Sequence, residues 1–174
     1  MSNVPNLVLV DDHSLLRSAL ARVLESELGF PVLYECNNGN ELKKWLVRDN
    51  EPDIILMDIN MPGLDGYETI SWLKEAHPEV KVIVLSMSDD ETSIMRMVKN
   101  GARGYVLKDV SPTELKTAIA SVSSSGYYYS ELVSGTLLHA VHKDDDEGSD
   151  LKKVLKLKEK DIGFLKLVDR KSVV

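Results

Sequence analysis

Several short apolar segments of this sequence end in side chains that can bind a cation or a phosphate group. Asp11 and Asp12 follow LVLV, Asp58 follows IILM, Ser86 ends VKVIVLS and Lys108 ends GYVLK. Carboxylates that crowd together raise one another's pKa unless a cation is present. Their oxygens suit Mg²⁺, which commonly takes one or two carboxylates together with phosphate oxygens. These residue types therefore favour the chemistry of phosphoryl transfer.

Three of these residues have definite roles toward a phosphoryl group. Lys108 would pair with a phosphate oxygen as a point charge, and the Ser86 hydroxyl would donate a hydrogen bond to it. Asp58, the central carboxylate, is the predicted nucleophile. Taken singly, an Asp at the end of a strand most often caps the next helix or lies in a solvated loop. The prediction therefore depends on all five residues lying together.

Alternating strand-like and helix-like segments would bring the five residues together. Strands are predicted at residues 6–10, 31–36, 53–57, 80–86 and 104–108, and helices at 14–28, 41–49, 64–76, 90–100 and from 111 onward. Five successive βα units predict an α/β fold with a parallel sheet and helices on both faces. Such sheets bind ligands beyond the carboxyl ends of their strands, where all five residues are predicted to lie.

Capping residues predict where two of these helices begin. Ser14 is the predicted N-cap of the first helix, and Gly29 is its predicted C-terminal stop. The fifth helix opens with SPTE. There Ser111 is the predicted N-cap, Pro112 takes the first helical position and Glu114 closes a capping box.

The composition limits the cell compartment and the class of protein. A chain of 174 residues with 43% hydrophobic content is long enough for one core and a small second unit. Its apolar runs are far shorter than the roughly 20 residues of a membrane span, so no membrane anchor is predicted. The single cysteine, Cys36, is typical of a reducing cytoplasm. The histidines do not have metal-site spacing; they are His13, His77, His139 and His142.

Charge divides the chain into three parts. The net charge is −7 for residues 1–126, −5 for residues 127–150 and +5 for residues 151–174. Such shifts predict domain boundaries. The acidic run DDDEGSD at residues 144–150 is predicted to be a solvated linker. The basic segment after it favours phosphate contacts, with a solvated helix face as the alternative.

The polar strand ends resemble those of a known family. LVLVDDH, ILMDINMPGLDG, IVLSMS and GYVLKD match, in order, the motifs of the receiver domain of two-component response regulators over residues 6–125. Each motif alone is weak, whereas the ordered set is specific. The resemblance implies that residues 1–126 form a receiver domain. Its implied fold is a flavodoxin-like (βα)5 doubly wound parallel sheet with strand order 2-1-3-4-5.

The resemblance also implies a function for the acidic residues. Asp58 would accept a phosphoryl group from a sensor histidine kinase, so the protein would be a phosphoacceptor and not a turnover enzyme. Mg²⁺ would be held by Asp12, Asp58 and the backbone carbonyl of Asn60, with Asp11 acting through a metal-bound water. Phosphorylation would favour a homodimer.

Residues beyond the acidic cluster complete the family pattern. Ser86 would grip the phosphate while Tyr105 swings inward behind it, although Tyr105 could instead simply pack at the sheet edge. Met87 stands where receivers usually carry Ala or Gly, so we expect it to slow access to the phosphate site. The Lys108-Asp109 pair is typical of the NarL/FixJ subgroup, which implies a DNA-binding output domain.

The C-terminal part fits such an output domain. Residues 130–141 predict a helix within a linker at 127–150, which ends in the acidic run. Residues 155–168 are similar to the opening of a LuxR-type helix-turn-helix domain, with an ordinary amphipathic helix as the alternative. The matching residues are Leu157, Lys160, Asp161, Leu165 and Leu167, whereas Lys158 replaces the usual Thr. Because few residues follow, we expect residues 151–174 to be a truncated fragment of that domain, with DNA bound only by the full-length protein.

Two other functions compete with the phosphorylated receiver. A Mg²⁺-dependent phosphohydrolase would also use an aspartyl-phosphate, but it usually carries Asp-x-Asp at the first strand, whereas this chain has VDDH. A stand-alone protein-interaction receiver would never be phosphorylated, and Met87 favours that alternative. A phosphohydrolase would process many substrate molecules, whereas a receiver modifies only itself. A phosphorylation assay would distinguish the phosphorylated receiver from the interaction receiver.

Overall fold

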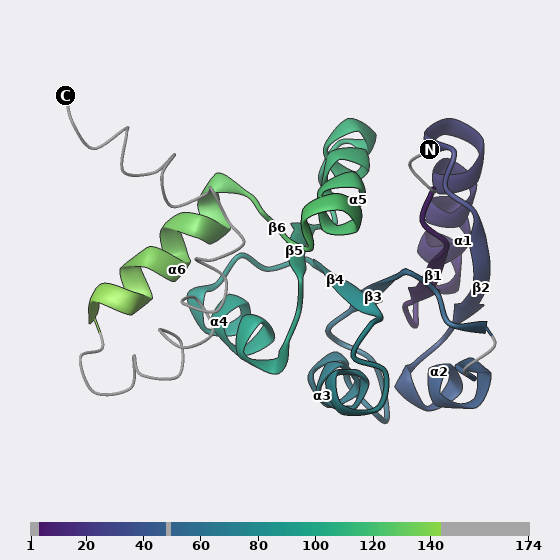
Figure 1. Ribbon diagram of the computed structural model, residues 1–174, viewed down its shortest axis with the longest axis horizontal. Helices are drawn as coiled ribbons and strands as arrows, with labels where there is room; N and C mark the ends of the chain where they lie inside the picture. Colours follow the sequence, from purple (N-terminus) through teal and green to yellow (C-terminus); the bar gives the residue numbers. More distant parts are fainter. Residues whose placement is uncertain (1–3, 48–49, 144–174) are drawn as a thin grey trace.

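The protein folds around a single parallel sheet. The structure, a computed structural model, describes residues 4–47 and 50–143, the last four of them as backbone alone. The strands lie in the order β2-β1-β3-β4-β5-β6 (Figure 1). They are β1 (Leu7–Val10), β2 (Val32–Cys36), β3 (Ile54–Asp58), β4 (Lys81–Ser86), β5 (Gly104–Leu107) and β6 (Tyr128–Tyr129). The predicted flavodoxin-like sheet with strand order 2-1-3-4-5 is confirmed, and a sixth strand extends it.

Helices cover both faces of the sheet. They are α1 (Ser14–Val23), the π-helical segment η1 (Leu24–Leu28), α2 (Gly39–Trp45), α3 (Gly66–Ala76), α4 (Glu91–Asn100), α5 (Pro112–Ser125) and α6 (Glu131–Lys143). Figure 1 shows α1 and α5 on one face of the sheet and α2, α3 and α4 on the other. None of the helices in the described ranges combines the length and the apolar character needed to cross a membrane.

Strand β3 shows how the sheet builds two cores. Ile55 and Met57 belong to the apolar cluster under α2, α3 and α4, whereas Ile54 and Leu56 belong to the cluster under α1 and α5. Each of the four is at most 1% exposed. Successive side chains of a strand point to opposite faces, so a strand covered on both faces must be apolar throughout. The apolar run therefore ends only where the strand leaves the core, at Asp58.

The register of the sheet aligns the ends of the strands. Val10 pairs with Met57, Asp58 pairs with Leu85, and Ser86 pairs with Leu107. The residues that follow these positions therefore emerge at the same edge, as the sequence predicted from the rule for parallel sheets.

Some of the predicted helix ends are confirmed, whereas the predicted N-cap of the first helix is wrong. Gly29 has φ 76° at the end of η1, a conformation that a glycine adopts without strain. The Ser111 side chain accepts a hydrogen bond from the Glu114 backbone N–H at 3.2 Å and caps α5. Ser14 is not an N-cap: it is the first residue of α1, and His13 occupies the cap position without a side-chain cap bond.

The second helix is shorter and earlier than predicted. It begins at Gly39, because the Asn38 side chain accepts a hydrogen bond from the Glu41 backbone N–H at 3.0 Å, and it ends at Trp45. The predicted helix 41–49 missed this N-cap. The last two residues of the predicted range lie outside the described residues.

The sixth strand lies where the sequence predicted the start of the linker. Tyr128 donates its backbone N–H to the Arg103 carbonyl at 2.9 Å, and its hydroxyl donates to the Glu114 carboxylate at 3.3 Å. Tyr129 donates its hydroxyl to the Ala102 carbonyl at 3.1 Å. These bonds fix residues 128–129 to the edge of β5. The predicted helix at 130–141 is confirmed as α6, whereas the acidic run and the predicted helix-turn-helix fragment lie outside the described residues.

Candidate functional site

A buried lysine lies between two buried carboxylates at the carboxyl edge of the sheet. Lys108 Nζ is 2.7 Å from Asp11 Oδ2 and 3.2 Å from Asp58 Oδ1. The three side chains are 7%, 9% and 5% exposed, respectively. They come from residues just beyond β5, just beyond β1 and at the end of β3. The structure thus brings together three of the five residues on which the prediction depended.

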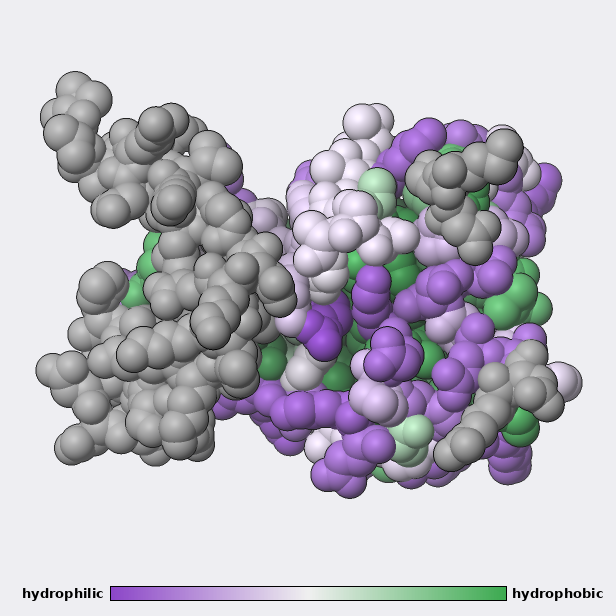
Figure 2. All heavy atoms as spheres, in the orientation of Figure 1, coloured by the Kyte–Doolittle hydropathy of each residue, from purple (hydrophilic) through white to green (hydrophobic). Residues whose placement is uncertain are grey.

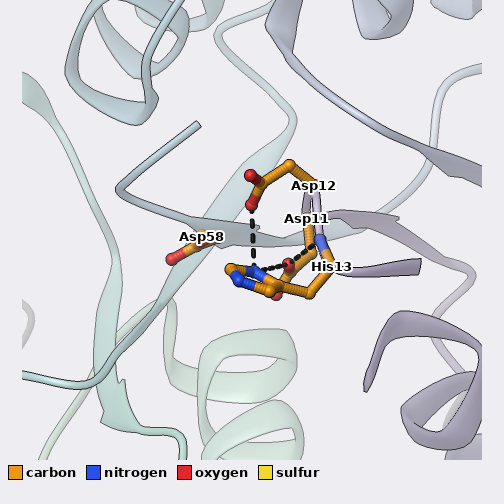
Figure 3. Close-up of side chains that lie close together, drawn as sticks. All are labelled: Asp11, Asp12, His13 and Asp58. Atoms are coloured by element: carbon orange, nitrogen blue, oxygen red, sulfur yellow. Dashed lines mark hydrogen bonds and ion pairs between the residues drawn. The ribbon is translucent and has the colours of Figure 1, made fainter. Parts of the chain in front are cut away.

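Asp12 and His13 complete an acidic cluster around this lysine. One ligand atom from each of Asp11, Asp12, His13 and Asp58 lies within 4.8 Å of the others (Figure 3). His13 Nδ1 is 3.2 Å from Asp11 Oδ1 and 3.0 Å from Asp12 Oδ1. The His13 side chain is 68% exposed at the N-terminus of α1. Its contact with both carboxylates was not predicted, because histidine spacing along the chain says nothing about neighbouring acids.

The electrostatics of the site leave Asp58 ready to accept a positive partner. Burial raises the pKa of Asp58, and the Asp11 charge adds to this rise, while Lys108 and the Asn60 backbone N–H oppose it. Burial alone would lower the pKa of Lys108, but its hydrogen bond to Asp11 and the charges of Asp58 and Asp11 raise it. The single lysine therefore does not offset the repulsion among the carboxylates.

The donor set fits a hard divalent cation. Asp11, Asp12 and Asp58 offer carboxylate oxygens close to one another at a site that Asp12 leaves partly open, with 30% of its side chain exposed. Oxygen donors in an open site with room for water are what Mg²⁺ requires. The Asn60 backbone lies beside Asp58 through its N–H, and the role of its carbonyl as a ligand stays a prediction.

Ser88 joins the predicted phosphate residue to the predicted switch residue. Its backbone N–H donates to Ser86 Oγ at 3.0 Å, and its carbonyl accepts from the Tyr105 hydroxyl at 2.5 Å. Its own hydroxyl donates at 2.7 Å to Asp90, the residue that caps α4. Ser86 is 2% exposed and Tyr105 is 1% exposed, so Tyr105 lies inside the fold. Ser88 was not predicted, because its bonds to Ser86 and Tyr105 use its backbone N–H and carbonyl, which its residue type does not reveal.

Arg17 also contacts the site and was not predicted. It donates through Nη1 to the Asp11 carbonyl and to Asn37 Oδ1, the second bond being 3.0 Å long. Its Nε donates to Glu35 Oε2 at 2.9 Å, and its side chain is only 11% exposed. Arg17 therefore ties the acidic loop after β1 to the end of β2. Within α1 it looks like an ordinary charged residue of a solvent-facing helix, so only the tertiary contacts distinguish it.

Removing the Arg17 guanidinium should loosen the acidic loop. Arg17→Gln is expected to lower the free energy of unfolding by about 1.5–3 kcal/mol, because a hydrogen bond to a charged group contributes about this much. Urea unfolding measures the change. Arg22→Gln is the matched control, since Arg22 is exposed in the last turn of the same helix. Equal stability of the two variants would contradict the prediction.

An apolar groove reaches the site from one side. It has a volume of about 230 Å³ between α1 and α5, and Asp11 and Lys108 contribute to its lining. The remaining lining residues are mostly apolar; they include Leu16, Leu20, Val23, Leu107 and Leu115. Figure 2 shows hydrophobic residues between these two helices on the face in view. The acidic site therefore borders an exposed apolar surface.

The fold and the site together define the class of protein. Residues 7–120 match the family of the response regulator receiver domain. This chain belongs to that family, and the resemblance to two-component response regulators of the NarL/FixJ subgroup is confirmed.

Two response regulators are similar to this chain over most of its length. The chain is 37% identical over 153 residues to the transcriptional regulatory protein DegU of Brevibacillus brevis, a match that covers 86% of this chain and 64% of DegU. It is 33% identical over 131 residues to the nitrate/nitrite response regulator protein NarL of Escherichia coli K12, covering 75% of this chain and 60% of NarL. The chain thus spans less than two thirds of the length of these relatives.

Solved structures agree with the fold. The isolated receiver domain of RcsB from Salmonella enterica serovar Typhimurium, solved in the presence of phosphomimetic BeF₃⁻, superposes with a TM-score of 0.69 at 26% identity. The match covers 77% of this chain and 99% of that domain. A structure of two RcsB dimers bound to two parallel DNAs gives a TM-score of 0.72 at 26% identity, over 82% of this chain and 70% of that one.

Proposed function

We propose that this chain accepts a phosphoryl group from a sensor histidine kinase on Asp58 and thereby controls a DNA-binding output. The observation that best supports this proposal is the position of Asp58, which is buried beside Lys108 and lies close to Asp11 and Asp12. Burial leaves its carboxylate without full solvation, and Lys108 gives a phosphate oxygen a positive partner next to it.

The transfer can be written from the residues in place. An Asp58 oxygen attacks the phosphorus of the donor phosphohistidine, and an O–P bond forms as the P–N bond breaks. The electron pair of that bond returns to the donor imidazole, which takes up a proton. Lys108 holds a phosphoryl oxygen, and the Ser86 hydroxyl donates to another. Asp12, Asp58 and the Asn60 carbonyl would hold Mg²⁺, with Asp11 acting through a metal-bound water, and the ion would supply positive charge toward the phosphoryl oxygens.

The partners follow from the same proposal. The apolar groove beside Asp11 and Lys108, together with exposed Leu15 and Leu16, offers a contact surface for a kinase. The full-length protein would bind DNA as a homodimer after phosphorylation, which accords with DegU being a transcriptional regulatory protein and with the RcsB dimers on DNA. The protein would act in the cytoplasm, as a stoichiometric phosphoacceptor and not as a turnover enzyme.

Intact-protein mass spectrometry tests the proposal. The chain is incubated with acetyl phosphate and Mg²⁺, with EDTA in a parallel sample. One phosphoryl adduct per chain is expected with Mg²⁺ and not with EDTA, and tandem mass spectrometry should locate it on Asp58. A chain that stays unmodified with acetyl phosphate and with a phosphorylated kinase domain would instead be a protein-interaction receiver. Steady release of phosphate from many donor molecules, without an adduct, would indicate a phosphohydrolase.

Met87 should set the rate of this reaction. Its side chain is 80% exposed and directly follows Ser86. Met87→Ala should therefore speed phosphorylation by acetyl phosphate and loss of the phosphoryl group by about twofold to fivefold, less than 1 kcal/mol in each barrier. Time courses of the adduct mass measure both rates. Met87→Leu keeps the bulk of the side chain and should behave as the wild type, and the prediction fails if both variants change equally.

A further inference from the structure

His13 lies against the acidic site but has no part in the phosphoryl transfer proposed above. Its Nδ1 atom is 3.2 Å from Asp11 Oδ1 and 3.0 Å from Asp12 Oδ1 (Figure 3). One ligand atom of Asp58 lies within 4.8 Å of the ligand atoms of these three residues. His13 therefore adds a nitrogen donor to a set of carboxylate oxygens.

The imidazole and the Lys108 ammonium occupy different parts of this site. Lys108 Nζ contacts Asp11 Oδ2 at 2.7 Å, whereas His13 faces Oδ1 of the same carboxylate. The Lys108 side chain is 7% exposed, whereas those of Asp12 and His13 are 30% and 68% exposed. A cation that arrives from solvent can therefore reach Asp12 and His13 without displacing Lys108 from Asp11.

The two exposed donors have the spacing of neighbouring ligands on one metal ion. In octahedral coordination with metal–ligand distances of about 2.1 Å, adjacent ligand atoms lie about 3.0 Å apart. His13 Nδ1 and Asp12 Oδ1 are 3.0 Å apart. The His13 backbone N–H donates to Asp11 Oδ1 at 2.8 Å, which holds His13 next to the carboxylates. The two donors thus need little rearrangement to share an ion.

The other histidines with described side chains lack this arrangement. His77 Nδ1 is 2.6 Å from one carboxylate, that of Glu51, and His139 Nδ1 is 3.8 Å from that of Glu91. Within the ranges that the structure describes, neither histidine belongs to a group of three or more side chains that could hold a metal ion. His13 is the described histidine that is placed to bind one.

We propose that His13 is a metal ligand of the acidic site and makes this site prefer a divalent first-row transition cation, such as Ni²⁺, to Mg²⁺. The proposal rests on the proposed function and deepens its metal site. Carboxylate and carbonyl oxygens suit Mg²⁺, whereas imidazole nitrogen suits transition cations. Because both kinds of ion would use Asp12 and Asp58, a bound transition cation would exclude Mg²⁺.

Isothermal titration calorimetry of the whole chain, prepared without a histidine tag, tests the proposal with nickel chloride and magnesium chloride. Wild type should bind a single Ni²⁺ at least about tenfold more tightly than Mg²⁺. His13→Ala should lower the ratio of the two affinities at least about tenfold, since even groups that only support a ligand contribute about 10–100-fold to metal affinity. The change in this ratio reports the imidazole, because any set of oxygen donors has some preference among ions.

His139→Ala is the matched control. It removes a histidine on α6 that is 66% exposed and also lies near a carboxylate, so it should keep the wild-type ratio. His13→Ala should fold, because His13 takes the N-cap position of α1 without a side-chain cap bond. His13→Gln, which keeps a polar side chain, serves if His13→Ala does not fold.

The outcomes separate this proposal from the proposed function. An unchanged ratio in a folded His13 variant, or an equal fall in His139→Ala, overturns the role of His13. If Mg²⁺ still supports the adduct on Asp58 in wild type, the proposed function stays in place. A wild-type chain that binds neither ion and forms no adduct overturns both.

Discussion

Asp58→Asn should abolish the phosphoryl adduct and at the same time make the unphosphorylated protein more stable. The substitution removes the nucleophilic oxygen, so the mass of the chain should not change with acetyl phosphate and Mg²⁺. It also removes a carboxylate whose pKa is raised by burial and by Asp11, while Lys108 keeps its 2.7 Å partner Asp11. We expect the free energy of unfolding at pH 7 to rise by about 1 kcal/mol.

The pH dependence gives this prediction its sign. Because the pKa of Asp58 is raised on folding, the folded protein holds that proton more tightly than the unfolded chain does. The stability contributed by this group is therefore present at low pH and is lost as pH rises from the ordinary Asp pKa of 3.8 through the pKa of Asp58 in the folded protein. Urea unfolding should show the variant more stable than wild type at pH 7, with the difference shrinking toward pH 4.

Two results would contradict the prediction. An adduct of equal yield in Asp58→Asn would move the acceptor to Asp11 or Asp12. A variant that is less stable than wild type at pH 7 would mean that the bonds of the Asp58 carboxylate, including the one with Lys108, outweigh its burial and repulsion. Both outcomes can be read from the same protein samples.

Lys108→Met should have the opposite effect on stability and a larger one. It leaves Asp11 and Asp58 buried without their shared cation, and removing one partner of a buried ion pair costs about 3–5 kcal/mol. We expect a loss near the lower value, about 3 kcal/mol at pH 7, since Asp12 keeps one side of the cluster open to water. Chemical unfolding in urea measures it.

Acid and Mg²⁺ should each reduce the loss caused by Lys108→Met. With the ammonium gone, the pKa of Asp58 rises further, so lowering the pH to 5 neutralises part of the unpaired charge and brings the variant closer to wild type. Mg²⁺ at millimolar concentration should do the same by supplying positive charge. Lys116→Met, at an exposed position of α5, is the control and should change stability little. An equal loss at pH 5 and pH 7 would exclude the unpaired carboxylates as its cause.

The positions of Asp11, Asp58, Ser86 and Lys108 were predictable from the sequence because each of these residues lies at the end of a strand. Val, Ile and Leu in β3 are required by burial on both faces, so the first charged residue after them marks the edge of the core, and Asp58 is that residue. The same argument places Asp11, Ser86 and Lys108. Parallel strands all point the same way, so residues at the carboxyl ends of different strands lie at the same edge of the sheet.

Other features could not be predicted from short sequence segments, because the residues that contact one another lie far apart in the chain. The two residues of β6 are too few to show a period of two, and only their pairing with Gly104 and Tyr105 of β5 makes them a strand. Ser14 looked like a cap, because its residue type is a good one, but the backbone of α1 begins one residue earlier than that assignment requires. Arg17 reaches Asp11, Glu35 and Asn37, and Ser88 reaches Tyr105; neither set of contacts can be read from residue type or periodicity.

The sequence by itself therefore determined the class of fold, the edge of the sheet that carries the acids, and the identity of those acids, since burial and strand direction dictate all three. The tertiary structure alone decided that Lys108 bridges Asp11 and Asp58 across 97 positions of the chain, that Ser88 links Ser86 to Tyr105, and that α6 lies on α4. The physical reason is that periodicity reports which side of an element is buried, whereas distances between elements depend on how whole helices and strands pack together.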